Sequence, residues 1–223
     1  MNTNPLISIV ITSYNYDMFL KETINSALSQ TYSNTEVIVV DDGSSDNSPN
    51  IIKNYGESII PILKENNGQA SSFNAGFNAS RGEIIFFLDS DDILFPTAIE
   101  KIEKLFEEPG VSKVHWLLEK VDALGRKTGD IVPEYELSDG DLLEDLLQFG
   151  PDKCGGPPHS PPTSGNAWSR KFLEKVFPIP EEEYKTNTDY YLFLTAPLLV
   201  RLEVFLKFWD IIECTGKITV LFL

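Results

Sequence analysis

From Leu6 to Phe106, short apolar runs alternate with segments in which apolar residues recur at helical spacing. The apolar runs predict buried strands at Ile7–Ile11, Glu36–Val40, Ile59–Leu63 and Glu83–Leu88. Between them, one helix has the core stripe Leu20, Ile24, Ala27 and Leu28, and another covers Gln69–Ala79. Strands that alternate with helices are typical of a mostly parallel sheet flanked by helices, so the predicted fold class is α/β.

After Phe106 the pattern becomes less regular. The segment Gly150–Gly165 holds five prolines and four glycines, so we expect no regular structure there and interpret it as a functional flap or a disordered loop. The other segments predict a strand at Val114–Val121, a turn at Ala123–Lys127, a helix at Asp141–Leu147 with Leu142, Leu143, Leu146 and Leu147 inward, helices at Arg170–Val176 and within Thr186–Leu199, and a final strand at Ile218–Leu223.

Two of the predicted strands end in acidic residues. Glu36–Val40 is followed by Asp41-Asp42-Gly43-Ser44-Ser45-Asp46, in which Gly43 permits a positive φ and Asp46 can cap a helix that begins near Ser48. Glu83–Leu88 is followed by Asp89-Ser90-Asp91-Asp92. In open α/β sheets the ligand crevice lies just outside the carboxyl ends of the strands. We therefore expect a ligand site that contains both groups of acids.

Charge and composition exclude several classes of function. The 223 residues include 18 Lys+Arg and 34 Asp+Glu, a net charge of −16, which argues against nonspecific binding to nucleic acid or anionic lipid. Cys154, Cys214, His115 and His159 are too few for a disulfide framework or a zinc cluster. We expect no secretion signal, and no transmembrane helix because charged residues interrupt Leu192–Leu223. The expected location is cytoplasmic, with peripheral attachment to the inner face of the membrane left open.

The acids after the second of these strands favour a metal site. Asp89, Asp91 and Asp92 would repel one another unless a cation lay between them. Carboxylates select Mg²⁺ or Mn²⁺, and Mg²⁺ binds through one or two carboxylates together with substrate phosphates. The inferred substrate is therefore a phosphate ester. The competing interpretation is that Asp89 or Asp92 caps the following helix or forms an Asx turn.

The other acids favour a nucleobase. Asp41 and Asp42 cannot both be caps, and a carboxylate in the crevice can accept a hydrogen bond from a base imide, while Tyr14 offers a face for stacking. Taken alone, Tyr14 is equally interpreted as an aromatic residue at the rim. The chain has neither a P-loop nor a Gly-x-Gly-x-x-Gly fingerprint. We infer metal-dependent use of a nucleoside diphosphate derivative.

Five ordered motifs carry a resemblance to a known family. They are Ile9–Asn15, Val37–Asp46, Asn66–Ala70 with Asn74–Gly76, Arg81–Glu83, and Phe87–Asp92. In order and spacing they resemble the inverting glycosyltransferases of family 2, which have the Rossmann-like GT-A fold. The later stretch Pro161–Arg170 and the helix with Asp189 look like the acceptor-side half of the same family.

The resemblance implies roles for individual residues. Thr12 and Tyr14 would line the base pocket, and Asp42 would contact uracil. Asp89-Ser90-Asp91 matches the Asp-x-Asp motif, so Asp91 would meet a Mn²⁺ or Mg²⁺ ion and Asp89 the ribose side. A register in which Asp91 and Asp92 form the functional pair stays open, and Asp92 is therefore kept among the metal ligands.

On the acceptor side, Asp189 matches the position of the catalytic base, although it lacks the glutamate that often precedes it. Phe73 stands where many relatives carry an arginine that faces the phosphates, so one cationic contact is missing. Gly155–Gly165 could be an acceptor lid, and Trp168 could supply a face for sugar stacking. His159 would be an acceptor contact or have no role.

The implied protein is a single domain in which residues 1–110 bind the nucleotide sugar and residues 111–223 form a smaller acceptor-binding half. It would be a metal-dependent inverting enzyme of the hexosyltransferase type that moves a sugar from a nucleotide diphosphate donor, expected to be a UDP-sugar, to a saccharide, lipid-linked or protein acceptor. The alternatives are a catalytically inactive nucleotide-sugar binding module and a nucleotidyltransferase. The sequence identifies neither the sugar nor the oligomeric state.

Overall fold

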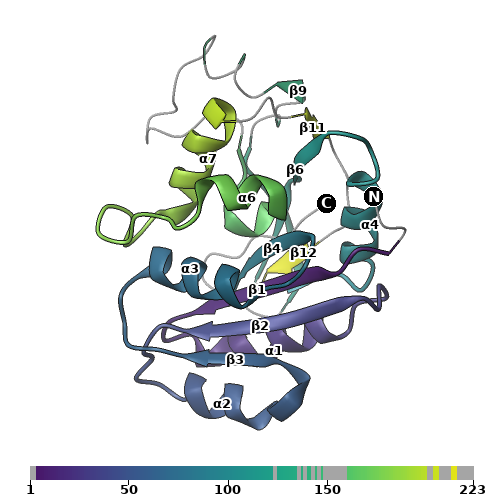
Figure 1. Ribbon diagram of the computed structural model, residues 1–223. Coiled ribbons are helices and arrows are strands. Elements are labelled where there is room, and N and C mark those ends of the chain that lie inside the picture. Colours follow the sequence, from purple (N-terminus) through teal and green to yellow (C-terminus); the bar gives the residue numbers. More distant parts are fainter. Residues whose placement is uncertain are drawn as a thin grey trace.

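The computed structural model describes residues 4–122, 125–134, 137, 140–141, 144, 147, 160–199, 203–205 and 212–214. Its main sheet has eight strands (Figure 1). Their spatial order is β3 (Ile60–Leu63), β2 (Thr35–Asp41), β1 (Ile7–Ser13), β4 (Ile84–Asp89), β10 (Asn166–Ser169), β6 (Val111–His115), β11 (Glu203–Phe205) and β9 (Gly140–Asp141). The first four strands are parallel, and β10 runs antiparallel to both of its neighbours. The predicted α/β class with a mostly parallel sheet is confirmed.

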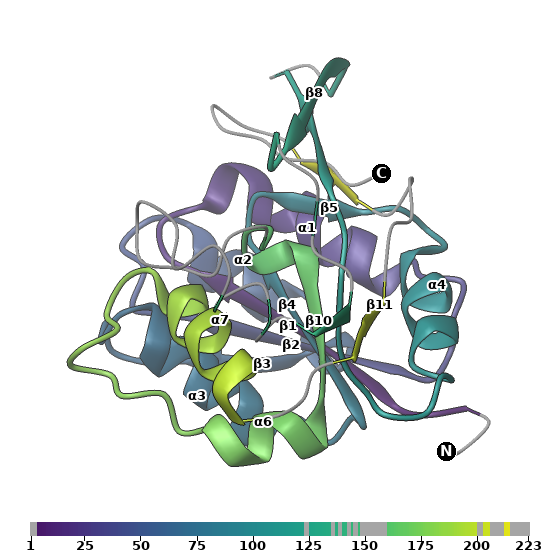
Figure 2. The same ribbon diagram turned by 90° about the horizontal axis from the view of Figure 1, so that it is seen from above.

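A second sheet has four strands, in the order β5 (Asp92–Leu94), β12 (Ile212–Cys214), β7 (Leu118–Val121) and β8 (Lys127–Val132). Figure 2 shows β8 projecting from the body of the molecule. The prediction of one strand over Val114–Val121 is wrong, because β6 and β7 belong to different sheets and Trp116 lies between them. Trp116 is only 1% exposed, so the chain passes from one sheet to the other inside the core. No polar residue in the sequence indicates this break between the two strands.

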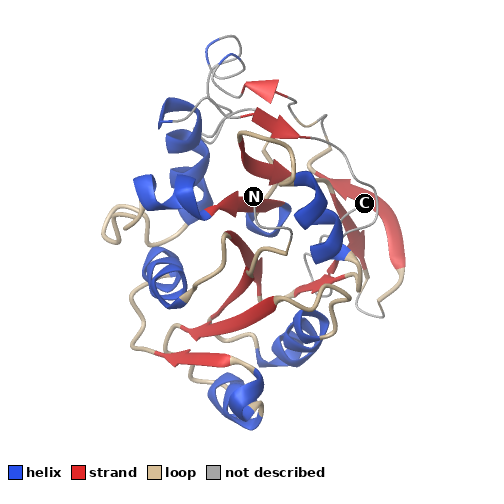
Figure 3. Cartoon of the chain, turned by 45° about the vertical axis from the view of Figure 1, so that its right-hand side comes forward, coloured by secondary structure: helices blue, strands red, loops and turns tan. Residues whose placement is uncertain are grey.

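Helices cover both faces of the main sheet (Figures 2 and 3). The helices α1 (Asp17–Leu28), α2 (Ser48–Asn54) and α4 (Ala98–Leu105) pack on one face, and α3 (Gln69–Ala79), α6 (Arg170–Val176) and α7 (Thr188–Leu199) pack on the other. Two short 3₁₀ turns, η1 (Gly56–Ser58) and η2 (Thr163–Gly165), complete the described elements. The strand period of two explains this layering, since Ile9 and Ile11 of β1 face the first group of helices while Val10 faces the second.

The predicted stripe of the first helix is confirmed at three of its positions. Leu20, Ile24 and Ala27 are fully buried, whereas Leu28, the last residue of α1, is 39% exposed. The polar residue Thr23 is also buried, and its hydroxyl donates to the carbonyl oxygen of Ser90 at 2.8 Å. On the other face, α3 approaches β1 so closely that a Cβ on Gly76 would lie 2.2 Å from Val10 Cγ1.

Beyond β8 only parts of the sequence predictions can be compared with the structure. Leu147 was expected to point inward but is 77% exposed, so the prediction of a buried side chain is wrong for this residue. Leu142, Leu143, Leu146, residues 150–159 with Gly155 and His159, and the strand at Ile218–Leu223 lie outside the described residues. Within the described part of the chain, no helix has the length and apolar character needed to cross a membrane.

Candidate active site

The candidate site lies at the edge where β1, β2 and β4 end. The register of the sheet places Thr12 of β1 beside Asp89 of β4, and Ser13 beside Asp41 of β2. A cavity of about 620 Å³ opens at this edge, and the N-terminus of α3 and the segment before α7 complete its wall. Its size falls in the range of small-molecule sites. Of the residues proposed from sequence, it is lined by Thr12, Tyr14, Asp42, Asp89 and Asp91.

The carboxylate of Asp42 is held by donors from the loop that follows β3. Lys64 Nζ forms an ion pair with Asp42 Oδ1, which also accepts a hydrogen bond from the Asn67 N–H at 3.1 Å. The other oxygen, Oδ2, accepts from the Gly68 N–H at 2.8 Å. Three of the roughly four lone-pair positions of the carboxylate are therefore occupied by the protein itself.

Gly68 connects this carboxylate to the segment before α7. Its φ is +92°, and a Cβ there would lie 2.7 Å from the carbonyl oxygen of Lys185, so only glycine fits. The next residue, Gln69, donates its backbone N–H to Lys185 O at 2.8 Å and accepts the Thr188 N–H on its side-chain oxygen at 3.1 Å. The start of α7 is thus fixed directly to the start of α3.

Asp89 at the end of β4 and Asp91 just after it lie in a different environment from Asp42. Burial raises the pKa of Asp89 well above its ordinary value, and the charges of Asp92, Asp91 and Asp189 raise it further. Burial also raises the pKa of Asp91, to about 6. Tyr16 lies close enough for the Asp91 charge to raise the pKa of its hydroxyl, with burial as a second cause. The structure describes no ion pair for Asp89, Asp91 or Asp189, so only hydrogen bonds, such as the one between Ser164 and Asp89, oppose the raised pKa values.

This donor set fits a hard divalent cation that binds together with a substrate. Oxygen ligands suit Mg²⁺ and Mn²⁺, and a cation would relieve the repulsion that raises the pKa values. Within the described residues, no three His, Cys, Asp or Glu side chains are arranged to hold a metal by themselves. That arrangement agrees with a site that needs substrate phosphates and water as its remaining ligands. Asp92 does not line the cavity; it is the first residue of β5 and is buried.

Asp189 lies in the first turn of α7, beside the cavity rather than in its wall. It borders a gap, with Phe73, Trp168 and Leu192, that has no room for a ligand. Burial raises the pKa of Asp189, while the Tyr190 N–H donates to Oδ1 at 3.0 Å and opposes that shift. The electrostatic effect of Asp189 on Asp89 shows that the proposed base and the proposed metal acids share one region.

Two aromatic residues differ in their surroundings from what the sequence suggests. Trp168, expected to offer a face to a sugar, is 1% exposed and stacks on Phe172 with ring centroids 5.2 Å apart. It is buried because β10 is a central strand between β4 and β6. Phe73, at the position of the missing arginine, is fully buried and stacks on Phe87 at 4.3 Å.

Sequence reasoning assigned no role to several residues that build this site. Lys64, Gln69 and Lys185 contact or line it, and Ser164 of η2 accepts the Asp89 N–H on its hydroxyl at 3.0 Å. Gln69 belongs to a motif noticed in the sequence, but its partner Thr188 is 119 residues away. Only the folded chain reveals such a pairing.

Comparisons with known proteins agree with this geometry. The profile described as "Glycosyl transferase family 2" matches residues 8–177. An uncharacterized glycosyltransferase of Nostoc sp. is 38% identical over 187 residues, which are 82% of this chain and 56% of the relative. An uncharacterized glycosyltransferase of Rickettsia prowazekii is 43% identical over 97 residues, which are 44% of this chain and 30% of the relative. The chain thus spans about half the length of the first of these relatives and less of the second.

Solved structures share the fold. TarS of S. aureus in complex with UDP-GlcNAc has a TM-score of 0.71 at 20% identity, over 95% of this chain and 59% of that chain. The mannosyltransferase PcManGT from Pyrobaculum calidifontis, in complex with GDP-Man and Mn²⁺, has a TM-score of 0.63 at 17% identity, over 92% of this chain and 55% of that chain. At these identities the likeness establishes the fold.

Proposed function

The chain belongs to glycosyl transferase family 2, and we propose that it moves a sugar from a UDP-sugar to an acceptor hydroxyl in a metal-dependent reaction that inverts the anomeric carbon. One observation carries the proposal: Tyr14, Asp42 and Asp91 line a single cavity, next to the buried Asp189. In this proposal residues up to 110 bind the donor, and the later segments bind the acceptor.

The nucleotide would occupy the part of the cavity between β1 and β2. Tyr14 is 49% exposed and can stack on the base, with Thr12 beside it. Asp42 has one lone-pair position left after its three protein contacts, which suits a single imide N–H of uracil. The complexes of TarS with UDP and UDP-GlcNAc support a uridine donor, and the GDP-Man complex of PcManGT makes guanosine the donor to test against it.

The chemistry would divide between the two groups of acids. When bound at Asp91, Mn²⁺ or Mg²⁺ would neutralise charge that grows on the diphosphate as the glycosidic bond breaks. Asp189 would take the proton from the acceptor hydroxyl while that oxygen attacks the anomeric carbon from the face opposite the diphosphate. The raised pKa makes Asp189 a stronger base than an ordinary aspartate, and Oδ2 is the oxygen that the Tyr190 N–H leaves available.

Nucleotide release tests this proposal without knowledge of the acceptor, because water can replace the hydroxyl. We expect slow release of UDP from UDP-GlcNAc or UDP-glucose in Mn²⁺, and loss of that release in excess chelator and in Asp91→Asn. Asp130→Asn, which changes an exposed aspartate on β8, should keep it. Faster release of GDP from GDP-mannose would refute the uridine assignment. UDP binding without any release would favour the inactive binding module.

A further inference from the structure

A second cavity lies at the opposite edge of the main sheet. Its volume is about 460 Å³, within the range of small-molecule sites. It is lined by Ile84, the first residue of β4, by Val111, the first residue of β6, and by Ser169, the last residue of the antiparallel β10. The candidate active site is at the other end of β4, where Asp89 ends the strand. The two cavities share no lining residue.

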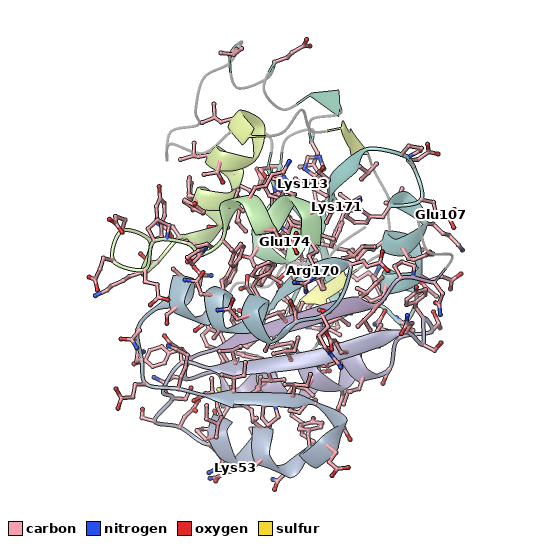
Figure 4. All side chains as sticks on the ribbon, viewed as in Figure 1. Lys53, Glu107, Lys113, Arg170, Lys171 and Glu174 are labelled. Atoms are coloured by element: carbon pink, nitrogen blue, oxygen red, sulfur yellow. The ribbon has the colours of Figure 1, made fainter. Side chains whose placement is uncertain are left out.

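The wall of this second cavity is mainly apolar, and its rim is charged. Pro5, Ile84, Phe106 and Val111 are buried side chains of the wall. Figure 4 shows Glu107 in the turn just after α4, and Arg170, Lys171 and Glu174 on α6. Glu83 adds a further exposed carboxylate.

Arg170 donates its hydrogen bonds to neutral groups rather than to these carboxylates. Its Nε donates to Gly82 O at 2.6 Å, and its Nη2 donates to Ser80 Oγ at 2.7 Å. The guanidinium also lies over the ring of Phe77, 5.1 Å from its centroid. Lys171 is therefore the single uncommitted cation among the described lining residues, against four glutamates. The cavity favours a positively charged ligand.

Glu103 is a charged residue of the cavity lining that is almost fully buried. It lies on the buried stripe of α4, between Ile102 and Phe106, and is only 8% exposed. Its carboxylate lines the cavity and has no hydrogen bond or ion pair with the described residues. The neighbouring Lys104 is exposed and paired instead with Glu100, at 2.7 Å. Burial raises the pKa of Glu103, and the charge of Glu107 adds to this effect.

Other buried glutamates of the described chain are partnered. Glu36 accepts hydrogen bonds from Ser8 Oγ at 2.6 Å and from Arg81, and Glu119 forms an ion pair with Lys127 at 2.8 Å. Glu103 has no such partner among the described residues, so its carboxylate is available to a ligand in the cavity that donates hydrogen bonds.

We propose that this second cavity binds a small organic cation, a primary ammonium group on an apolar stem. The ammonium donates hydrogen bonds to the Glu103 carboxylate, and the wall of Ile84, Phe106 and Val111 covers the stem. A neutral apolar ligand would leave Glu103 unpartnered, and an anion would meet four carboxylates in a chain of net charge −16. This inference does not depend on the proposed function, because the cavity is separate from the nucleotide cavity.

The test compares two ligands of the same shape, hexylamine and hexan-1-ol, at neutral pH. Their binding to the full chain is followed through backbone amide chemical shifts in NMR titrations. We expect hexylamine to shift amides at the end of α4 and the start of α6 in a saturable way, with a dissociation constant at least tenfold lower than that of hexanol. Equal affinities, or shifts at other positions, would overturn the proposal.

A substitution tests whether the Glu103 carboxylate is the group that binds the ammonium. Glu103→Gln keeps the shape but removes the charge, and should weaken hexylamine at least tenfold while hexanol binding stays the same. Glu57→Gln is the matched control, since it removes the same charge from exposed η1 next to β3. Unchanged hexylamine binding by Glu103→Gln would refute the site. The comparison of the two ligands on the unmodified chain remains decisive if Glu103→Gln does not fold.

Discussion

Asp42 follows β2 and Asp89 ends β4, so both lie at the same edge of one sheet. Asp42 has three donors from its own chain, among them Lys64. Asp89 and Asp91 have no cation in the described structure, and burial and mutual repulsion raise the pKa of Asp89. The comparison teaches that position at the edge does not determine the role of an acid. The first acid organises the loop that shapes the cavity, and the others carry charge that no cation of the described structure offsets.

The largest expected effect concerns Asp189, whose carboxylate, like that of Asp89, is buried and has a raised pKa. Asp189→Asn should lower turnover by roughly 10²–10⁴, the usual contribution of a positioned general base, and leave UDP binding unchanged. An asparagine side chain can accept the Tyr190 N–H as aspartate does, so a purely structural role for Asp189 predicts full activity instead. The measurement is nucleotide release beside UDP titration, with Asp130→Asn as the control.

Asp42→Ala tests the structural side of the comparison. It leaves Lys64 and the N–H groups of Asn67 and Gly68 without their acceptor, so the free energy of unfolding should fall by about 1–3 kcal/mol. Urea denaturation measures this change. Asp91→Ala removes an acid that has no ion pair in the described structure and should cause no comparable loss. Equal losses in the two variants would show that both acids are structural.

Metal removal tests the ligand-binding side. The affinity for UDP should fall at least tenfold, about 1.4 kcal/mol, when excess chelator replaces Mn²⁺ in a calorimetric titration. Asp91→Asn should show the weaker affinity in both conditions. If the unmodified chain binds UDP equally with and without the metal, the assignment of Asp91 as a metal ligand is wrong.

The smallest expected effect is a gain in stability. An acid whose pKa is raised by folding destabilises the native state once the pH exceeds the ordinary value of an aspartate, and the penalty is complete above the raised value. Asp89→Asn should therefore stabilise the metal-free chain at neutral pH. The gain should disappear near pH 4. Thermal unfolding at both pH values measures it, and a loss of stability at neutral pH would contradict the view that this charge is uncompensated.

The sequence predicted the elements that depend on local pattern. The strands β1 to β4 and helix α3 agree with the predictions to within about two residues, because each apolar run or helical stripe is bounded by its own turn residues, whereas β5 was not predicted. Five proposed site residues line one cavity, because the acids directly follow strands whose order the α/β pattern implies.

Features that depend on distant partners could not be predicted. The ion pair of Asp42 with Lys64 and the bond of Gln69 to Thr188 need the folded chain. Trp168 was misjudged because its burial follows from the insertion of β10 between β4 and β6. Glu103 interrupts the apolar stripe of α4, but sequence pattern alone cannot distinguish a residue that faces a cavity from one that faces solvent.

The insertion of β10 also has a consequence during synthesis. Until β10 has left the ribosome, β4 exposes an edge that is rich in isoleucine and phenylalanine, and unpaired apolar edges promote aggregation. Ser164, just before β10, is 75 residues beyond Asp89, a delay of about 4–15 s at ordinary rates of translation. A nascent chain stopped at residue 160 should therefore be cleaved by protease within β4, whereas the completed sheet resists it. Equal resistance would show that the edge is protected before β10 arrives.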